Sequence, residues 1–248
     1  MQKFFLLIAF VPALCLATPQ DPATTDATGR KFAERTPAKP LRVLLAGAGT
    51  SHDFPKFFLG TDAQTLTTTG NIDVVSTPNL VEALALLPQA DVMVFSGNHP
   101  QYGQPEFQKA LHAFADQGKG LVILHASNWN HPWPGYNARF VGGATPNHGK
   151  GEFRVTLKNP AHPVMKGLPA TFSIIDESYH PTFASAAAVE WLAENAPDNT
   201  GKSYPSVWVV KDPKTRVVCI TLGHAAEAHE NPAFQTLLVN SVNWVAGR

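Results

Sequence analysis

Several polar residues of this sequence follow directly after apolar runs that are typical of buried strands. Four such runs are short, rich in Val, Ile and Leu, and bounded by glycine or polar residues. Ligands of open α/β sheets bind just beyond the carboxyl ends of parallel strands, so we expect these polar side chains to meet at one edge of a sheet. The side chains are His52, Asn98, His125 and His224, which end or follow the runs at residues 41–47, 90–96, 119–125 and 216–222.

Imidazole groups gathered in this way can carry two kinds of chemistry. Neutral histidine is a good base near pH 7 and its protonated form a good acid, and we assign these roles to His125 and His224 without deciding which residue has which. Histidine is also a common metal ligand, and without a compact ligand motif the ligands would have to converge from separate loops. The candidate ligands of Zn²⁺ or another divalent transition ion are His52, His125, His148 and His224.

The segment at residues 176–180, Asp-Glu-Ser-Tyr-His, adds two carboxylates. Side chains alternate along a strand, so Asp176 and Glu177 are expected to face opposite ways, with Tyr179 on the side of Glu177. Asp176 and Glu177 are candidate catalytic carboxylates that orient an imidazole, and the alternative is a strand-end hydrogen bond. Tyr179 is a candidate for binding the substrate.

Aromatic residues and further histidines have both functional and structural interpretations. Trp129 and Tyr136 lie in a loop with several Pro and Gly residues, where they could form a platform for stacking a sugar or could pack that loop. His162 lies in Asn-Pro-Ala-His-Pro, where turn chemistry is at least as good an explanation as function. We expect His112, on a helix, and His229, in solvent, to have no role in the site.

The elements that must position these residues alternate between strand and helix from Leu41 onward. This order predicts a parallel sheet with right-handed crossovers and helices on both faces. The second half of the chain has short strand patterns that look antiparallel and are added at the edge of the sheet. The expected strands span residues 41–47, 72–76, 90–96, 119–125, 151–158, 172–180, 189–194, 206–210 and 216–222. One helix is expected to begin near residues 53–55, and three more are expected at residues 79–87, 104–117 and 231–246.

Composition excludes several classes of partner. The 248 residues carry 19 basic and 19 acidic side chains, a formal net charge of zero, and no block of like charge. Nucleic acid and anionic membrane are therefore not expected as partners, and a small neutral molecule suits this surface better. Hydrophobic residues make up 44% of the chain, which is enough for a sizeable core.

The first residues predict export. Residues 1–17 combine Lys3, an apolar stretch and small residues at a cleavage site, as in a secretory signal peptide. Residues 18–40 are rich in Thr, Ala, Pro and Asp and predict a disordered leader, and residues 41–248 form the domain. The mature protein is expected in the periplasm or outside the cell. Its single cysteine, Cys219, cannot form an internal disulfide and is expected in the core.

At these residues the chain resembles the ThuA-like (trehalose utilisation) family, within the class I glutamine amidotransferase-like superfamily. The resemblance covers about residues 41–246, and it implies a flavodoxin-like, doubly wound α/β fold with an antiparallel insertion in the second half. The motifs that carry it are residues 118–125, residues 136–148 with Gly142-Gly143, His162-Pro163-Val164, residues 176–179, and the segment from Arg216-Val217 to Leu222-Gly223-His224.

The resemblance implies a role in carbohydrate metabolism, in particular on glycosides oxidised at carbon 3. A sugar or glycoside would then be the partner, bound by His52, Asn98, Trp129, Tyr136, His148 and Tyr179. Glutaminase activity is not expected, because the position of the nucleophilic cysteine on the strand-to-helix turn holds His125. Ser127 as a nucleophile lacks the Gly-x-Ser-x-Gly context. The alternatives are a non-catalytic carbohydrate-binding protein and an accessory subunit of a sugar-processing assembly.

Overall fold

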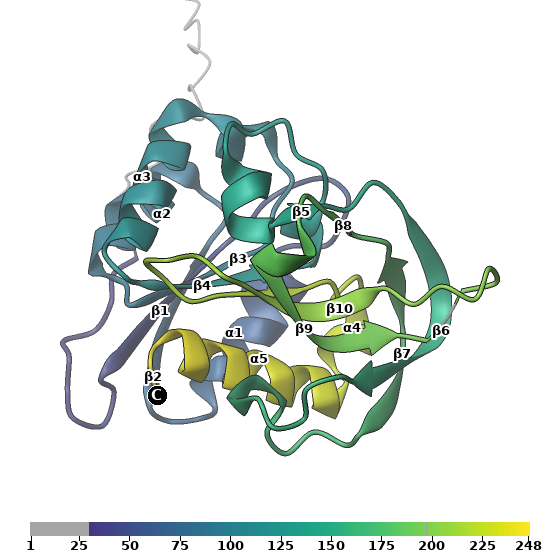
Figure 1. The fold of residues 1–248 in the computed structure, drawn as a ribbon. Coiled ribbons are helices and arrows are strands. Elements are labelled where there is room, and N and C mark those ends of the chain that lie inside the picture. Colours follow the sequence, from purple (N-terminus) through teal and green to yellow (C-terminus); the bar gives the residue numbers. More distant parts are fainter. Residues whose placement is uncertain (1–29, 197) are drawn as a thin grey trace, which may run out of the picture.

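One large sheet runs through the whole domain in the computed structural model, which describes residues 30–196 and 198–248. Its nine strands have the order β2-β1-β3-β4-β11-β10-β9-β6-β7 (Figure 1). The strands are β1 (Leu41–Ala46), β2 (Ile72–Thr77), β3 (Val92–Phe95), β4 (Gly120–Leu124), β6 (His148–Leu157), β7 (Thr171–Tyr179), β9 (Val189–Asn195), β10 (Pro205–Val210) and β11 (Val217–Ile220). A separate two-stranded sheet pairs β5 (Gly143–Ala144) with β8 (Thr182–Phe183).

The half of the sheet that holds β2, β1, β3, β4 and β11 is parallel, as predicted. Alternate residues of its strands enter two different cores. Leu121 and Ile123 pack toward one face, whereas Val122 and Leu124 pack toward the other. Both faces are covered by helices, which explains why these strands are apolar throughout.

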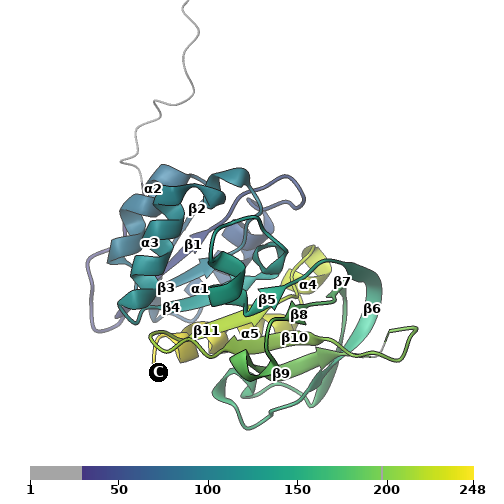
Figure 2. The ribbon, with the colours of Figure 1, turned by 45° about the horizontal axis from the view of Figure 1, so that its top comes forward.

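The helices divide between the two faces (Figure 2). The core below α2 (Leu80–Leu86) and α3 (Pro105–Asp116) includes Phe107 and Phe114, and the core below α1 (Asp62–Thr67) and α5 (Pro232–Val245) includes Phe234. A short helix, α4 (Ala226–His229), precedes α5. The fold is therefore a doubly wound α/β fold of the flavodoxin-like type, as predicted.

The predicted antiparallel segment extends the main sheet beyond β11. Strand β10 pairs antiparallel with β11, followed in space by β9, β6 and β7, each antiparallel to its neighbour. Figures 1 and 2 show these strands curving away from the parallel half at the end of the molecule opposite α2 and α3. This extension brings β6 and β7 beside the loops that follow β1, β4 and β11.

Helix starts follow the sequence signals with one exception. Asn79 caps α2 by accepting hydrogen bonds from the backbone amides of Val81 and Glu82. Asp53 likewise accepts from Lys56, as a helix cap would, but a wide π-helical turn at Phe57–Thr61 comes between this cap and α1. The first regular helix therefore begins later than the predicted residues 53–55.

The last part of the predicted leader lies against the domain. Phe32 is buried in the core below α2 and α3, and Arg35 makes a bidentate ion pair with Asp91. Residues 30–40 are therefore held by burial and charge, in contrast to the predicted disorder. The predicted signal peptide, at 1–17, and residues 18–29 lie outside the described residues. Within residues 30–196 and 198–248, no helix has the length and apolar character needed to cross a membrane.

Candidate functional site

His125 stands at a strained turn directly after β4. Its φ of 33° lies in the left-handed region, and among the residues that the structure describes it is the only non-glycine with a positive φ. Such a backbone conformation costs on the order of 1–3 kcal/mol and persists where the surrounding structure enforces it. The imidazole is completely buried, and its Nδ1 lies 2.5 Å from the carbonyl oxygen of Thr221. A carbonyl can only accept, so Nδ1 carries the hydrogen and Nε2 keeps a free lone pair.

The turn after β11 presents His224. Gly223 has a φ of 119°, which permits this turn at little cost. The carboxylate of Asp176 accepts hydrogen bonds from the backbone amides of Gly223, at 2.7 Å, and of His224, at 2.9 Å. Asp176 therefore shapes the backbone that carries His224. Its predicted catalytic position is corrected, because both carboxylate oxygens face this backbone and the residue does not line the pocket.

The loop after β1 supplies His52. Its Nδ1 lies 2.5 Å from the hydroxyl of Ser51, which also accepts a hydrogen bond from the side chain of Asn98 at 2.6 Å. The ring of His52 packs edge-on against the rings of His125 and His224, with centroids 4.7 and 4.8 Å away. The loops after β1, β3, β4 and β11 therefore do converge, as their positions at the ends of parallel strands predicted.

Glu177 of β7 reaches into the middle of these three imidazoles. Its Oε2 lies 3.4 Å from Nε2 of His125 and 3.2 Å from Nδ1 of His224. One nitrogen from each of His52, His125 and His224 and one oxygen of Glu177 all lie within 4.8 Å of one another. We call these four residues the His₃Glu cluster.

The environment of the cluster lowers the pKa values of three of its members, for different reasons. Burial, together with the neighbouring His125 and His224, lowers the pKa of His52 to about 3. Burial also lowers the pKa of His224. For Glu177, burial acts in the raising direction, but close contact with His125 and the charges of the surrounding histidines lower its pKa to about 2. At neutral pH the cluster therefore combines a carboxylate with neutral imidazoles at His52 and His224.

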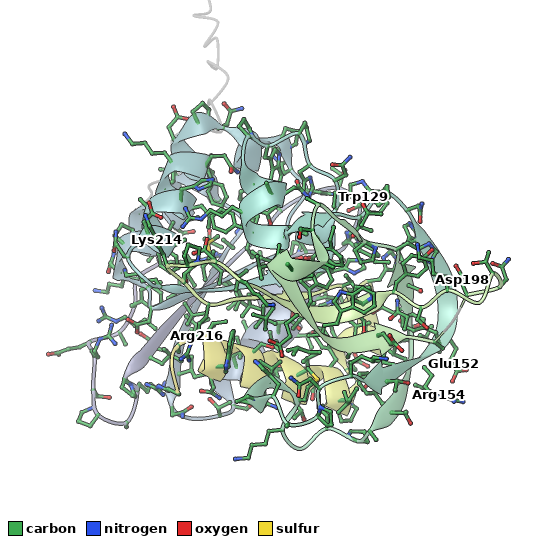
Figure 3. All side chains as sticks on the ribbon, viewed as in Figure 1. Trp129, Glu152, Arg154, Asp198, Lys214 and Arg216 are labelled. Carbon is green, nitrogen blue, oxygen red and sulfur yellow. The ribbon has the colours of Figure 1, made fainter. Side chains whose placement is uncertain are left out.

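A pocket of about 290 Å³ opens beside the cluster. This volume is near the lower end, roughly 300 Å³, of the range usual for small-molecule sites. Figure 3 shows Trp129 on the side of the molecule away from Lys214 and Arg216. The pocket is lined by Ser51, His52, Asn98, Ala126, Trp129, His148, Glu177, Tyr179 and His224.

The structure corrects the placement of three predicted site residues. The ring of Tyr136 is fully buried against Phe95 and Trp133, and its hydroxyl donates to the carbonyl of Ser127, so it packs the loop and does not reach the pocket. His125 belongs to the cluster but is too deeply buried to line the pocket. His148 lines the pocket, as its predicted part in binding the substrate requires, but it is not in the four-residue group, where Glu177 has the position predicted for His148.

Other candidates have structural positions. Ser127 is buried, and its hydroxyl is engaged with the backbone of Gly97, so it is not presented as a nucleophile. His162 accepts a hydrogen bond from the amide of Val164 and so caps a short turn, in line with its turn-forming sequence. Cys219 is free and buried, as predicted.

Sequence reasoning missed one buried pair next to the site. His229 was expected in solvent, but it is fully buried with Nδ1 2.7 Å from the carboxylate of Asp62 and Nε2 3.1 Å from the carbonyl of Gly223. Burial lowers the pKa of His229, but the Asp62 carboxylate and the Gly223 carbonyl outweigh it and raise that pKa. No local pattern could reveal this pair, because 167 positions separate its members.

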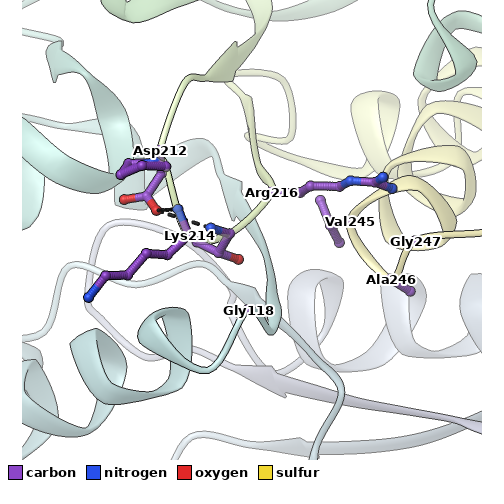
Figure 4. Close-up of a pocket in the computed structure, with 9 residues that line it drawn as sticks. Gly118, Asp212, Lys214, Arg216, Val245, Ala246 and Gly247 are labelled. Carbon is purple, nitrogen blue, oxygen red and sulfur yellow. Dashed lines mark hydrogen bonds between the residues drawn. The ribbon is translucent and has the colours of Figure 1, made fainter.

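A second cavity, of about 350 Å³, lies between the loop at residues 212–216 and the end of α5 (Figure 4). Asp212 in its wall accepts hydrogen bonds from the backbone amides of Lys214 and Thr215 and pairs with Arg139. Arg216 donates to the carbonyl of Trp244. These polar groups are used within the loop, so the cavity offers no comparable set for chemistry.

The fold of the chain has the glutamine amidotransferase-like α/β architecture. A GMP synthase subunit from Thermoplasma acidophilum has the same fold, with a TM-score of 0.56 and 13% identity over 84% of this chain and 94% of that one. In this chain the turn after β4 holds His125, and Cys219 is buried in β11.

The chain belongs to the ThuA family, described as trehalose utilisation, which matches residues 50–245. Two ThuA-like proteins of known structure are similar to it. The one from Parabacteroides merdae has a TM-score of 0.72 and 21% identity, covering 84% of this chain and 90% of that chain. The one from Bacteroides uniformis has a TM-score of 0.68 and 22% identity, covering 86% and 94%. No curated protein matches the sequence.

Proposed function

We propose that this protein is an exported carbohydrate-active enzyme that cleaves glycosides oxidised at carbon 3. Membership of a trehalose-utilisation family supports the choice of a sugar as ligand. The single observation that carries the proposal is the convergence of three imidazoles and the Glu177 carboxylate at the wall of one pocket. Such a group suits the binding and polarisation of a carbonyl, next to a side chain such as His148 that can move a proton.

The proposed reaction is an elimination followed by addition of water. A keto group at carbon 3 acidifies the hydrogen on carbon 2, so a base can remove it and leave an enolate. When the enolate collapses, the carbonyl re-forms, a double bond forms between carbons 1 and 2, and the bond from carbon 1 to the glycosidic oxygen breaks. The leaving oxygen takes up a proton from an acid. Water then adds across the double bond, so the net change is hydrolysis without oxidation or reduction.

We take His148 as the proton carrier in place of the expected pair, His125 and His224. His125 is completely buried, and His224 directs its Nδ1 at Glu177. His148 lines the pocket with 34% of its side chain exposed, and its Nδ1 lies 3.0 Å from the carbonyl oxygen of Gly149. Nδ1 therefore carries the hydrogen, and Nε2, 3.8 Å from Oε1 of Glu177, is free to accept a proton from a ligand. In this proposal, His125 and His224 contact the Glu177 carboxylate and hold it at the wall of the pocket.

Sugar binding is assigned to other side chains that line the same pocket. The rings of Trp129 and Tyr179 lie 5.5 Å apart, and Trp129 lies 5.8 Å from the ring of His148. An indole face can cover the apolar face of a sugar ring, while the Ser51 hydroxyl and the Asn98 amide can bond to sugar hydroxyls.

The test is turnover of a chromogenic 3-keto-glucoside, measured as release of its phenol. Wild-type protein is expected to release the phenol, and His148→Ala to lose at least ~100-fold in kcat. His180→Ala is the matched control, because His180 stacks on Tyr204 outside the pocket and its loss should leave kcat unchanged. Binding of the ligand without turnover in wild-type protein would overturn the enzymatic proposal in favour of a carbohydrate-binding protein.

Export is tested separately on the mature protein. Expression of the full chain in a Gram-negative host is expected to give a periplasmic product whose amino terminus begins after residue 17. A product that keeps Met1 would contradict this part of the proposal.

A further inference from the structure

We infer that the His₃Glu cluster is a binding site for one divalent transition cation, with Zn²⁺ as its best-matched ion. The ligand atoms are Nε2 of His52, Nε2 of His125, Nδ1 of His224 and an Oε of Glu177. This inference stands on the geometry of the four side chains. Only the part that the cation would play in catalysis rests on the proposed function.

The separations between the ligand atoms match a coordination sphere. Zinc binds imidazole nitrogen and carboxylate oxygen at roughly 2.0–2.2 Å, which makes the edge of a tetrahedron about 3.4 Å long. Nε2 of His125 and Nδ1 of His224 lie 3.4 and 3.2 Å from Oε2 of Glu177. All four ligand atoms lie within 4.8 Å of one another, so small side-chain rotations complete the set.

The nitrogens that face one another in the cluster lack well-formed hydrogen bonds. Nε2 of His52, Nε2 of His125 and Nδ1 of His224 are all buried and have no hydrogen-bond partner. The hydrogen of His125 lies on Nδ1, bound to the Thr221 carbonyl, so a lone pair of Nε2 faces the Glu177 carboxylate. Two electron-rich groups at this distance repel each other unless a proton or a cation lies between them. A bound cation removes the repulsion and satisfies all three nitrogens at once.

Supporting contacts hold each of the three histidines in an orientation that suits a metal site. The Thr221 carbonyl sets the tautomer of His125, the Asp176 carboxylate holds the backbone of His224, and the hydroxyl of Ser51 contacts the outer nitrogen of His52. Groups of this kind fix ring orientation at protein metal sites. Three nitrogens and one carboxylate oxygen are a donor set that suits zinc and neighbouring transition ions better than Mg²⁺ or Ca²⁺.

The position of the cluster in the pocket connects the cation to the proposed function. His52, Glu177 and His224 line the pocket, so a ligand oxygen can approach the site from the open side. A cation there would polarise the carbonyl at carbon 3 and stabilise the enolate, as metal ions do for developing oxyanions. His148 stays outside the ligand set and remains free for proton transfer.

The experiment is a calorimetric titration with Zn²⁺ of protein first dialysed against a chelator. Wild-type protein is expected to bind one Zn²⁺ per chain with a Kd below about 1 µM, and Glu177→Gln to weaken binding by about 100-fold. Glu152→Gln is the matched control, since Glu152 is an exposed glutamate on β6 that lies outside the cluster. His52→Ala provides a second disruptive variant on a loop, and circular dichroism confirms that each variant is folded.

The outcomes separate the metal site from the sugar reaction. No Zn²⁺ binding by folded wild-type protein, or equal affinity in Glu177→Gln and Glu152→Gln, would overturn the metal site. His148→Ala is expected to bind Zn²⁺ as wild type does, even though it loses turnover. Zinc binding by a protein that turns over no 3-keto glycoside would leave the metal site standing and reject the reaction.

Discussion

Two sites that contain histidine lie side by side in this molecule, the pair of Asp62 and His229 and the His₃Glu cluster, and their imidazoles differ in one respect. Both ring nitrogens of His229 have protein partners, the Asp62 carboxylate and the Gly223 carbonyl. Each histidine of the His₃Glu cluster instead leaves one buried nitrogen without a partner. The two groups meet at the Gly223–His224 turn, since His229 holds the carbonyl of Gly223 and the cluster contains His224.

The difference teaches how to tell a structural histidine from one that is prepared for a ligand. Burying a polar group without a partner costs on the order of 1–3 kcal/mol, so a fold tolerates three such groups together only where something else satisfies them. We expect the pair of Asp62 and His229 to stabilise the fold, and the unpartnered nitrogens of the cluster to lower the free energy of unfolding in return for ligand binding. Four predictions test that distinction, beginning with the largest effect.

Removal of Asp62 should be the most damaging change to stability. Asp62→Ala leaves His229 buried without its carboxylate, and breaking a buried pair in this way costs about 3–5 kcal/mol. Urea unfolding is expected to show this loss, while the folded variant still binds one Zn²⁺. Glu34→Ala, at an exposed carboxylate, is the control and should change the free energy of unfolding by less than about 1 kcal/mol. Loss of Zn²⁺ binding in folded Asp62→Ala would show that the two groups act as one.

Replacement of His125 should affect function much more than fold. His125→Asn keeps a residue type that tolerates positive φ, so the turn can be preserved. Loss of the buried imidazole is expected to lower kcat by about 100-fold and to weaken Zn²⁺ binding, as removal of groups at metal sites does. The measurements are turnover of a 3-keto glycoside and zinc titration. A wild-type kcat in this variant would show that His125 has a structural role, like His229, and no role in function.

The pH dependence of stability should come from His229. Because its folded pKa is raised above 6.5, its pairing with Asp62 stabilises the protein fully below about pH 6.5, and this contribution is lost as pH rises through the folded pKa. Chemical unfolding of metal-free protein should show that the advantage of wild type over His229→Gln narrows from pH 6 to pH 9. An advantage that stays constant or grows over this range would mean that His229 is neutral in the folded protein.

The smallest effect is expected at the rim of the pocket. Trp129→Ala removes the proposed stacking surface, which is worth about 1 kcal/mol, so KM should rise roughly 5- to 10-fold with kcat changed by less than about twofold. Trp191→Ala, on an exposed part of β9, is the matched control and should leave both values unchanged. Equal KM values for the two variants would remove Trp129 from the binding surface.

Much of the fold could be predicted because its signals are local. The apolar runs at β1, β3, β4 and β11 report strands buried on both faces, and Asn79 and Pro105 mark helix starts by capping and backbone geometry. The seating of residues 30–40 could not be predicted in this way. It depends on the packing of Phe32 in the core below α2 and α3 and on the ion pair of Arg35 with Asp91. Both are contacts between distant parts of the chain.

The same contrast between local signals and distant contacts holds for the site. The sequence by itself determined that His52, Asn98, His125 and His224 lie at one edge of the sheet, because parallel strands bring their carboxyl ends together. Only the tertiary structure decided that Glu177 enters the cluster and His148 stays at the rim, since this depends on the register in which β6 and β7 join the antiparallel extension. Packing also decided that Tyr136 fills a core and that His229 meets Asp62. Such choices are made by contacts between distant segments, which no spacing along the chain records.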